Sequence, residues 1–183
     1  MVDFASVRAI DFHTHAEEPC CDHRDDGYNE FQAGMAAYFK NPAGAKGMLP
    51  TVQDTANYYR ERNIAAVIFP VDAERETGFR RYSNEEVAGI CAENDDILIP
   101  FASVDPHKGK AGAREVRRLV RDFGVRGFKF HPTMQGFYPN DRETAYAVLE
   151  ACAEEGVITL FHTGQTGVGS GMPGGMGMRL KYS

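Results

Sequence analysis

Five short apolar segments recur along the chain, and each is followed by polar or turn-forming residues. Segments of roughly six to eight residues suit β-strands. Continuous apolar runs, such as the one from Ala65 to Phe69, are typical of strands that are covered on both faces. The predicted strands are Val7–His13, Ala65–Val71, Ile97–Val104, Val125–His131 and Val157–His162.

Helical patterns of apolar residues lie between these segments. Thr51 and Ser83 each stand three positions before an acidic residue, which is the pattern of a helix N-cap with a capping box. Gly124 and Gly156 follow the last apolar positions of two further patterns, where glycine commonly ends a helix. The predicted helices run from Thr51 to Asn63, from Ser83 to Asn94, from Ala111 to Phe123 and from Asp141 to Glu155.

From the second strand onward, strands and helices alternate, with a new strand about every 30 residues, the length of a βα unit. Crossover helices of this kind imply a parallel sheet. Two α/β architectures satisfy the pattern, a doubly wound sheet and a parallel (β/α)8 TIM-type barrel. With 183 residues the chain has room for one domain.

Two segments lack periodicity. Residues 16–50 form a stretch too long for an ordinary connection, and we expect a loop beside the active site. Residues 163–183 are rich in glycine, and we expect them to cover a bound substrate.

The segment Ile10-Asp-Phe-His-Thr-His15 carries the strongest local signal of chemistry. Side chains alternate along a strand, so we expect His13 and His15 to share one face and Phe12 and Thr14 the other. Two imidazoles placed in this way can bind one cation, with nitrogens about 2.0–2.1 Å from Zn²⁺. A polar strand end without a ligand is the alternative.

Histidines also close the fourth and fifth predicted strands, at His131 and His162. In parallel α/β proteins, active sites collect at the carboxyl ends of the strands. Four of the six histidines therefore lie where one site would form. This clustering favours a functional site over structural histidines.

Lys129 belongs to the same predicted strand as His131, and the two side chains share a face by alternation. That face points to the centre of the sheet or barrel, where a lysine is costly unless it is paired or used. An ion pair with a carboxylate such as Asp11 and a direct role in the site are both open.

Three motifs resemble, in order, those of the amidohydrolase superfamily: His13-Thr-His15, Gly127-Phe-Lys-Phe-His-Pro132 and Leu160-Phe-His-Thr-Gly164. The motifs look most like those of the amidohydrolase-2 group, which includes aminocarboxymuconate-semialdehyde decarboxylase and related C–C hydrolases and lactonases. The resemblance implies a (β/α)8 barrel with one divalent metal, usually Zn²⁺.

The resemblance also implies roles for particular residues. His13 and His15 match the first-strand metal ligands, and His162 matches the fifth-strand ligand. The family's sixth-strand histidine, an acid or base, and its eighth-strand aspartate ligand have no counterpart in the sequence. In related branches a carboxylated lysine on the fourth strand bridges two metals, and Lys129 stands on that strand. The candidates for substrate binding are Lys129, His131, Glu17 and Arg24.

The sequence contains five of the eight strands of such a barrel. We therefore expect residues 1–183 to be the N-terminal portion of a single barrel, with two open apolar edges. The predicted function is metal-dependent hydrolysis of a C–O, C–N or C–C bond in a small carboxylate or carbonyl substrate. The alternatives are a non-oxidative decarboxylase of the same family and an inactive half-barrel that binds a partner chain, a second copy included.

Net charge and hydropathy indicate which classes of partner the chain is expected to lack. The net charge of −6 argues against nucleic acid, which calls for a basic patch. No apolar stretch approaches the roughly 18 residues of a membrane span, and the first residues lack the features of a signal peptide, so we expect a cytoplasmic protein. Cys91 and Cys152 fall in helical patterns and are expected in the core. One helix face should be solvated and basic, through Arg114, Arg117, Arg118 and Arg121.

Two motifs are weaker than they look. Gly169-Ser-Gly-Met-Pro-Gly174 matches the glycine pattern of dinucleotide sites, but no helix follows and Pro173 lacks an N–H for phosphate. A doubly wound nucleotide binder is thus the least favoured hypothesis. Cys20-Cys-Asp-His23 lacks the paired spacing of a structural zinc site, and we expect it to border the active site instead.

Overall fold

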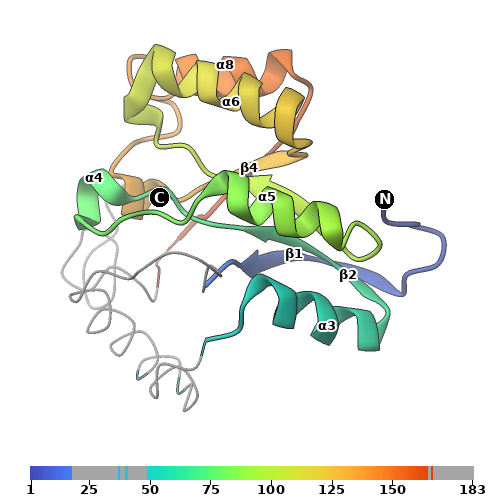
Figure 1. Ribbon diagram of the computed structural model, residues 1–183. Helices are drawn as coiled ribbons and strands as arrows, with labels where there is room; N and C mark the ends of the chain where they lie inside the picture. The colour runs from blue at the N-terminus through green and yellow to red at the C-terminus, as the bar shows by residue number, and fades with distance from the viewer. Residues whose placement is uncertain (18–36, 38–39, 41–48, 165, 167–183) are drawn as a thin grey trace.

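Five parallel strands form one sheet in the order β1-β2-β3-β4-β5 (Figure 1). The computed structural model describes residues 1–17, 37, 40, 49–164 and 166. The strands are β1 (Ala9–His15), β2 (Ile64–Phe69), β3 (Leu98–Ala102), β4 (Gly127–Phe130) and β5 (Ile158–Phe161). The first strand ends at His15 and not at His13 as predicted, so both histidines belong to it.

Each strand pairs with the next one in the sequence. A doubly wound sheet reverses its direction of growth at a switch point, whereas a barrel keeps adding strands on one side. The sheet is a curled half-barrel with the first five strands of a TIM-type barrel. The predicted fold class is confirmed, and the doubly wound alternative is wrong.

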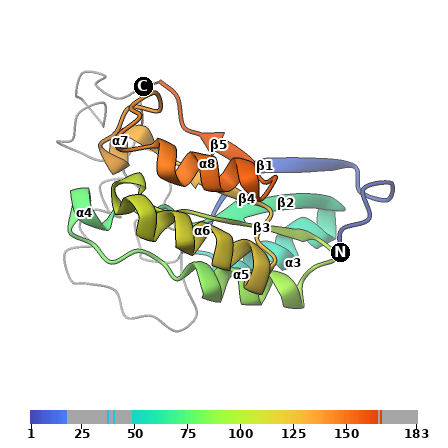
Figure 2. The ribbon, with the colours of Figure 1, turned by 90° about the horizontal axis from the view of Figure 1, so that it is seen from above.

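Four longer helices connect the strands, as predicted. Figure 2 shows α8, α6 and α5 side by side along the sheet. Thr51 and Asp54 form the predicted capping box, and the Ser83 hydroxyl accepts a hydrogen bond from the backbone N–H of Glu86. The helices are α3 (Val52–Arg62), α5 (Asn84–Glu93), α6 (Gly109–Phe123) and α8 (Tyr146–Glu154).

In the described part of the chain, three short helices were not predicted, and each follows the carboxyl end of a strand. They are α4 (Glu74–Thr77), η1 (Pro106–Lys108) and α7 (Pro132–Gln135), which come after β2, β3 and β4. The last long helix also begins later than Asp141, the predicted start. The Asp141 carboxylate accepts hydrogen bonds from the N–H of Glu143 and the hydroxyl of Thr144, which fixes a turn before the helix.

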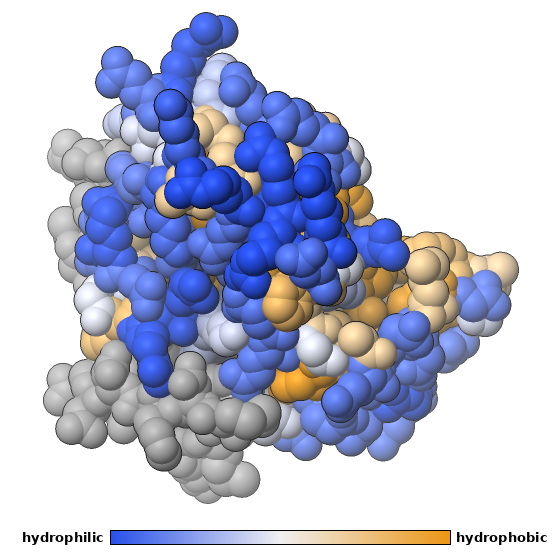
Figure 3. Space-filling model, turned by 45° about the horizontal axis from the view of Figure 1, so that its top comes forward, coloured by the Kyte–Doolittle hydropathy of each residue, from blue (hydrophilic) through white to orange (hydrophobic). Residues whose placement is uncertain are grey.

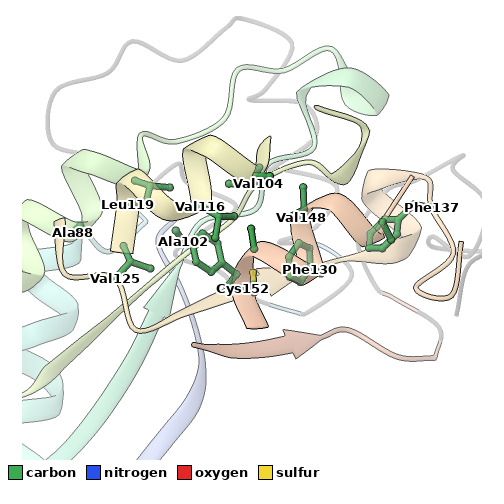
Figure 4. Close-up of a cluster of buried hydrophobic side chains, with 14 residues drawn as sticks. Ala88, Ala102, Val104, Val116, Leu119, Val125, Phe130, Phe137, Val148 and Cys152 are labelled. Atoms are coloured by element: carbon green, nitrogen blue, oxygen red, sulfur yellow. The ribbon is translucent and has the colours of Figure 1, made fainter. Parts of the chain in front are cut away.

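The largest buried apolar cluster lies between α6, α8 and the outer face of the sheet (Figure 4). The cluster contains Phe130 from β4, Val116 from α6, and Val148 and Cys152 from α8. A second cluster joins α3 and α5 to β2 and β3, and it includes Cys91. Cys91 and Cys152 are buried, as predicted, and neither forms a disulfide bond.

The opposite face of the sheet is the inner face of the half-barrel. Its buried cluster consists of Val67, Phe69 and Phe101. Gly127 makes room for one of these rings, because a Cβ atom at that position would lie 2.3 Å from Phe101. The inner face is therefore closely packed where β3 and β4 run side by side.

The predicted basic helix face is α6, and three of its arginines form ion pairs with acidic residues of α5 and α8 or the turn after it. The face in Figure 3 is mainly hydrophilic, with apolar side chains gathered toward one end. The pairs are Arg117 with Glu154, Arg118 with Glu85 and Arg121 with Glu155. Among the described residues, no helix is long and apolar enough to cross a membrane.

Candidate functional site

A β-bulge shapes the first strand at the first of its two histidines, His13. The register with β2 shifts between Asp11 and Thr14, so β1 carries one extra residue there. Asp11 and Thr14 both contact Tyr59 of α3 on the outer face, while Phe12 lies edge-on to Phe101 of the inner face at 6.5 Å. The expectation that Phe12 and Thr14 share a face is wrong, because simple alternation does not hold across a bulge.

The rings of His13 and His15 nevertheless converge as predicted. Their Nε2 atoms lie 3.2 Å apart, and both rings contact Phe69 at the end of β2. Burial lowers the pKa of both, and the positive charge of Lys129 adds to this effect. The pKa of His15 falls to about 3, so its ring is neutral at pH 7 and offers a lone pair.

Lys129 points into the half-barrel from β4 and is fully buried. Its Nζ lies 5.1 Å from the centre of the Phe69 ring and has no hydrogen-bond partner among the described residues. The alternative of an ion pair with Asp11 is wrong, since the Asp11 carboxylate accepts the hydroxyl of Tyr59 at 2.6 Å. Burial lowers the pKa of Lys129 to about 8.

His131 and His162 form a second pair at the ends of β4 and β5. Their rings stack with centres 4.1 Å apart and planes at 6°. The Nδ1 atom of His131 accepts a hydrogen bond from the N–H of Met134, which fixes the ring, and its Nε2 lies 3.4 Å from the hydroxyl oxygen of Thr166. Burial is the main reason why the pKa of His131 falls to about 2.

The buried side-chain amide of Gln135 holds the backbone of the His131–His162 pair at His131. Gln135 accepts the backbone N–H of His131 at 2.7 Å and donates to the carbonyl of Asp72 at 2.9 Å. The Ser103 hydroxyl donates to the carbonyl of Lys129 and accepts the N–H of Asp72. These bonds join the carboxyl ends of β2, β3 and β4 into one unit.

The His13–His15 pair and the His131–His162 pair lie near each other, but the described residues do not form a metal centre with three ligands. His162 is close enough for its charge to lower the pKa of both His13 and His15. Within the part of the chain that is described, however, no three His, Cys, Asp or Glu side chains are arranged to hold a metal. His15 and His162 stand on opposite edges of the sheet, so their separation depends on how tightly the sheet curls.

The first pair by itself fits a divalent metal. Two nitrogens 3.2 Å apart, each about 2.0–2.1 Å from one ion, subtend an angle of roughly 100° at it, close to tetrahedral. Neutral imidazole is also the form that binds metal. The ligand set of His13, His15 and His162 remains a prediction, of which the structure assembles the first two members.

The remaining candidates lie around this centre or outside the described residues. Glu17 follows β1, and its backbone carbonyl accepts the hydroxyl of Tyr82. Arg24, the Cys20–His23 segment and residues 167–183 are not among the described residues.

The residues predicted for the site did not include Phe69, Ser103, Gln135 or Tyr59. For Tyr59 a signal existed, because it follows Val52 and Ala56 on the buried side of α3 at helical spacing.

The paired imidazoles lie at the carboxyl ends of the strands, the end at which active sites form in TIM barrels. The family model described as amidohydrolase matches residues 10–183. The chain belongs to the amidohydrolase family.

One similar solved structure shares the fold. It is 5-carboxyvanillate decarboxylase from Novosphingobium aromaticivorans, with bound manganese and 3-methoxy-4-hydroxy-5-nitrobenzoic acid. The TM-score is 0.58 at 16% identity, over 86% of this chain and 50% of that one. The chain thus spans about half the length of the decarboxylase. No curated protein matches the chain.

Proposed function

We propose that the chain belongs to a divalent-metal-dependent enzyme whose metal is held by His13, His15 and His162. The convergence of the His13 and His15 Nε2 atoms carries the proposal. Membership of the amidohydrolase family supports it, as does the manganese in the similar decarboxylase. Zn²⁺ is our first choice of ion because three imidazoles suit it well, and Mn²⁺ is the second.

A divalent ion at this place supplies a Lewis acid that polarises a carbonyl group and lowers the pKa of a bound water toward 7. The chain supplies the surroundings. Phe69 forms an apolar wall beside the pair, and the buried Lys129 provides a positive charge for an anionic group of the substrate. His131 contributes a neutral ring held in one orientation.

The proposed reaction is hydrolysis of a small carboxylate or carbonyl substrate. Non-oxidative decarboxylation is the second candidate, because the similar structure is a decarboxylase with a benzoic acid bound. The buried cation of Lys129 is compatible with both, since it can bind the carboxylate of a substrate in either reaction. Products separate the two, because only decarboxylation releases CO₂ and only hydrolysis consumes water.

The metal site is tested by titrating the metal-free protein with Zn²⁺ in a calorimeter. We expect one equivalent to bind, and we expect His13→Ala and His15→Ala each to abolish the tight phase. His107→Ala is the matched control, because that histidine lies in η1 and contacts the carbonyl of Gly136 instead of the pair. An unchanged isotherm in His15→Ala would reject the proposed site.

His162 is tested separately, because the structure does not place it with the pair. We expect His162→Ala to weaken Zn²⁺ binding about 10-fold or more, since each added ligand fills one tetrahedral position. Zn²⁺ affinity equal to that of the unmodified chain would remove His162 from the ligand set and leave the His13–His15 pair in place.

A further inference from the structure

The hydroxyl of Tyr59 bridges the two residues that flank the β1 bulge. It donates to Oδ2 of Asp11 at 2.6 Å and lies 3.2 Å from Oγ1 of Thr14. The register shift with β2 falls between Asp11 and Thr14. Tyr59 is partly buried, and α3 carries it against the outer face of the sheet.

The other carboxylate oxygen of Asp11 completes the contact. Oδ1 accepts the backbone N–H of His13 at 2.9 Å, inside the bulge. One carboxylate therefore links the tyrosine of α3 to the backbone of the first histidine. The bond from Tyr59 is the main cause that lowers the pKa of Asp11, and the bond from His13 is the second.

The bulge decides where Asp11 points relative to the two histidines. In a regular strand Asp11, His13 and His15 would share one face. The extra residue turns Asp11 outward to Tyr59, while both imidazoles stay beside Phe69 on the inner face. Bulges commonly redirect side chains in this way beside active sites.

We infer that Tyr59 is a positioning residue for the His13–His15 pair, acting through Asp11 and Thr14 to hold the bulged backbone that carries His13. The inference extends the proposed function, on which its effect on metal affinity depends. β1 is an edge strand that pairs only with β2 in the described sheet, so the bulge has no second neighbouring strand to hold it.

The test compares Tyr59→Phe with Tyr58→Phe. The first removes the bridging hydroxyl and keeps the ring. The second removes the hydroxyl of the neighbouring, exposed Tyr58, whose ring lies 3.6 Å from the Arg62 guanidinium. Among the described residues, the Tyr58 hydroxyl makes no hydrogen bond to β1. Both variants keep the apolar packing of α3, so both are expected to fold.

The first measurement uses metal-free protein with ¹⁵N-labelled histidine. We expect the ring-nitrogen resonances of His13 and His15 to shift in Tyr59→Phe and to stay in place in Tyr58→Phe, while those of His107 move in neither. Unchanged His13 and His15 resonances in Tyr59→Phe would overturn the inference, even if the melting temperature falls.

The second measurement is Zn²⁺ affinity. We expect a loss of about 10- to 100-fold in Tyr59→Phe, the usual effect of removing a group that orients a ligand, and no change in Tyr58→Phe. Asp11→Asn keeps one carbonyl oxygen as an acceptor, so its Zn²⁺ affinity should lie between those of Tyr59→Phe and Tyr58→Phe. If the unmodified chain binds no Zn²⁺, the proposed function fails, and the metal-free resonances alone decide the positioning role.

Discussion

The two sides of the candidate site are built in different ways. On the β4 side, Lys129 and His131 are buried, and Gln135 and Ser103 tie their backbone to the ends of β2 and β3. On the β1 side, His13 is exposed on an edge strand, and its position depends on a bulge and one tyrosine hydroxyl.

This difference means that the two sides should affect different properties: the stability of the fold at the centre of the sheet, and the position of the His13–His15 pair at its edge. In the centre of the sheet, hydrogen bonds are buried and shared among three strands, so breaking them costs free energy of unfolding. At the edge, fewer bonds are involved and they are more exposed, so losing one alters the histidine pair more than the fold. Changes at the centre should therefore destabilise the protein, and changes at the edge should chiefly weaken metal binding.

Gln135→Ala should give the largest effect. It removes the side-chain amide that bonds to the N–H of His131 and to the carbonyl of Asp72. Both residues are buried, so these two groups lose their hydrogen-bond partner in the interior. Each such loss costs about 1–3 kcal/mol, so we expect destabilisation by about 4 kcal/mol in urea-induced unfolding. Gln53→Ala is the control, because this exposed glutamine of α3 bonds only to side chains, those of Asn57 and Asn94, and both Asn94 amide groups keep other partners; it should cost less. An equal loss of stability in Gln135→Ala and Gln53→Ala would contradict the greater role of the buried hydrogen bonds at the centre of the sheet.

Gly127→Ala tests the packing of the inner face. The added Cβ would lie 2.3 Å from the buried ring of Phe101, so that ring or β4 must move. We expect a loss of about 3 kcal/mol, the upper range for overpacking. In Gly89→Ala the new Cβ meets nothing within 4 Å on an exposed face of α5, and stability should rise slightly. Thermal unfolding of the two variants measures the difference.

Lys129→Met should raise stability at pH 7 and remove substrate binding. Burial depresses the lysine pKa from 10.5 to about 8, so the folded state resists protonation. Between these values the unfolded chain binds more protons, and stability of the unmodified protein rises with pH. The advantage of methionine, roughly 3 kcal/mol at pH 7, should therefore shrink between pH 8 and 10.5. A pH-independent difference would show that Lys129 has an anionic partner in the fold.

Thr51→Ala should give the smallest effect on stability. It removes the capping box of α3, the helix that carries Tyr59 to the edge strand. Loss of an N-cap side chain costs about 1 kcal/mol. We expect a small fall in melting temperature and a measurable loss of Zn²⁺ affinity. A loss of stability without any change in affinity would separate α3 from the histidine pair.

Much of the fold could be predicted because its signals are local. Apolar runs marked the strands, and Thr51, Ser83 and Gly124 marked helix ends through bonds within a few residues. The short helices η1 and α7 had only the prolines Pro106 and Pro132 as a signal, and proline at the first turn is compatible with a loop as well.

The candidate site could be predicted only in outline. The histidines were visible as strand ends, but the β1 bulge leaves no mark in the sequence because it depends on Tyr59, 48 positions from Asp11. The Gln135 network likewise joins residues up to 63 positions apart. Such contacts follow from the tertiary arrangement and not from local pattern.

X-ray absorption of the Zn²⁺-loaded protein tests the central claim most directly, because it counts the imidazole ligands of the ion. We predict at least two imidazole nitrogens at about 2.0–2.1 Å, and a loss of imidazole scattering in the His13→Ala, His15→Ala double variant. A Zn²⁺ spectrum dominated by oxygen or sulfur ligands, or one that is the same in the double variant, would contradict the account.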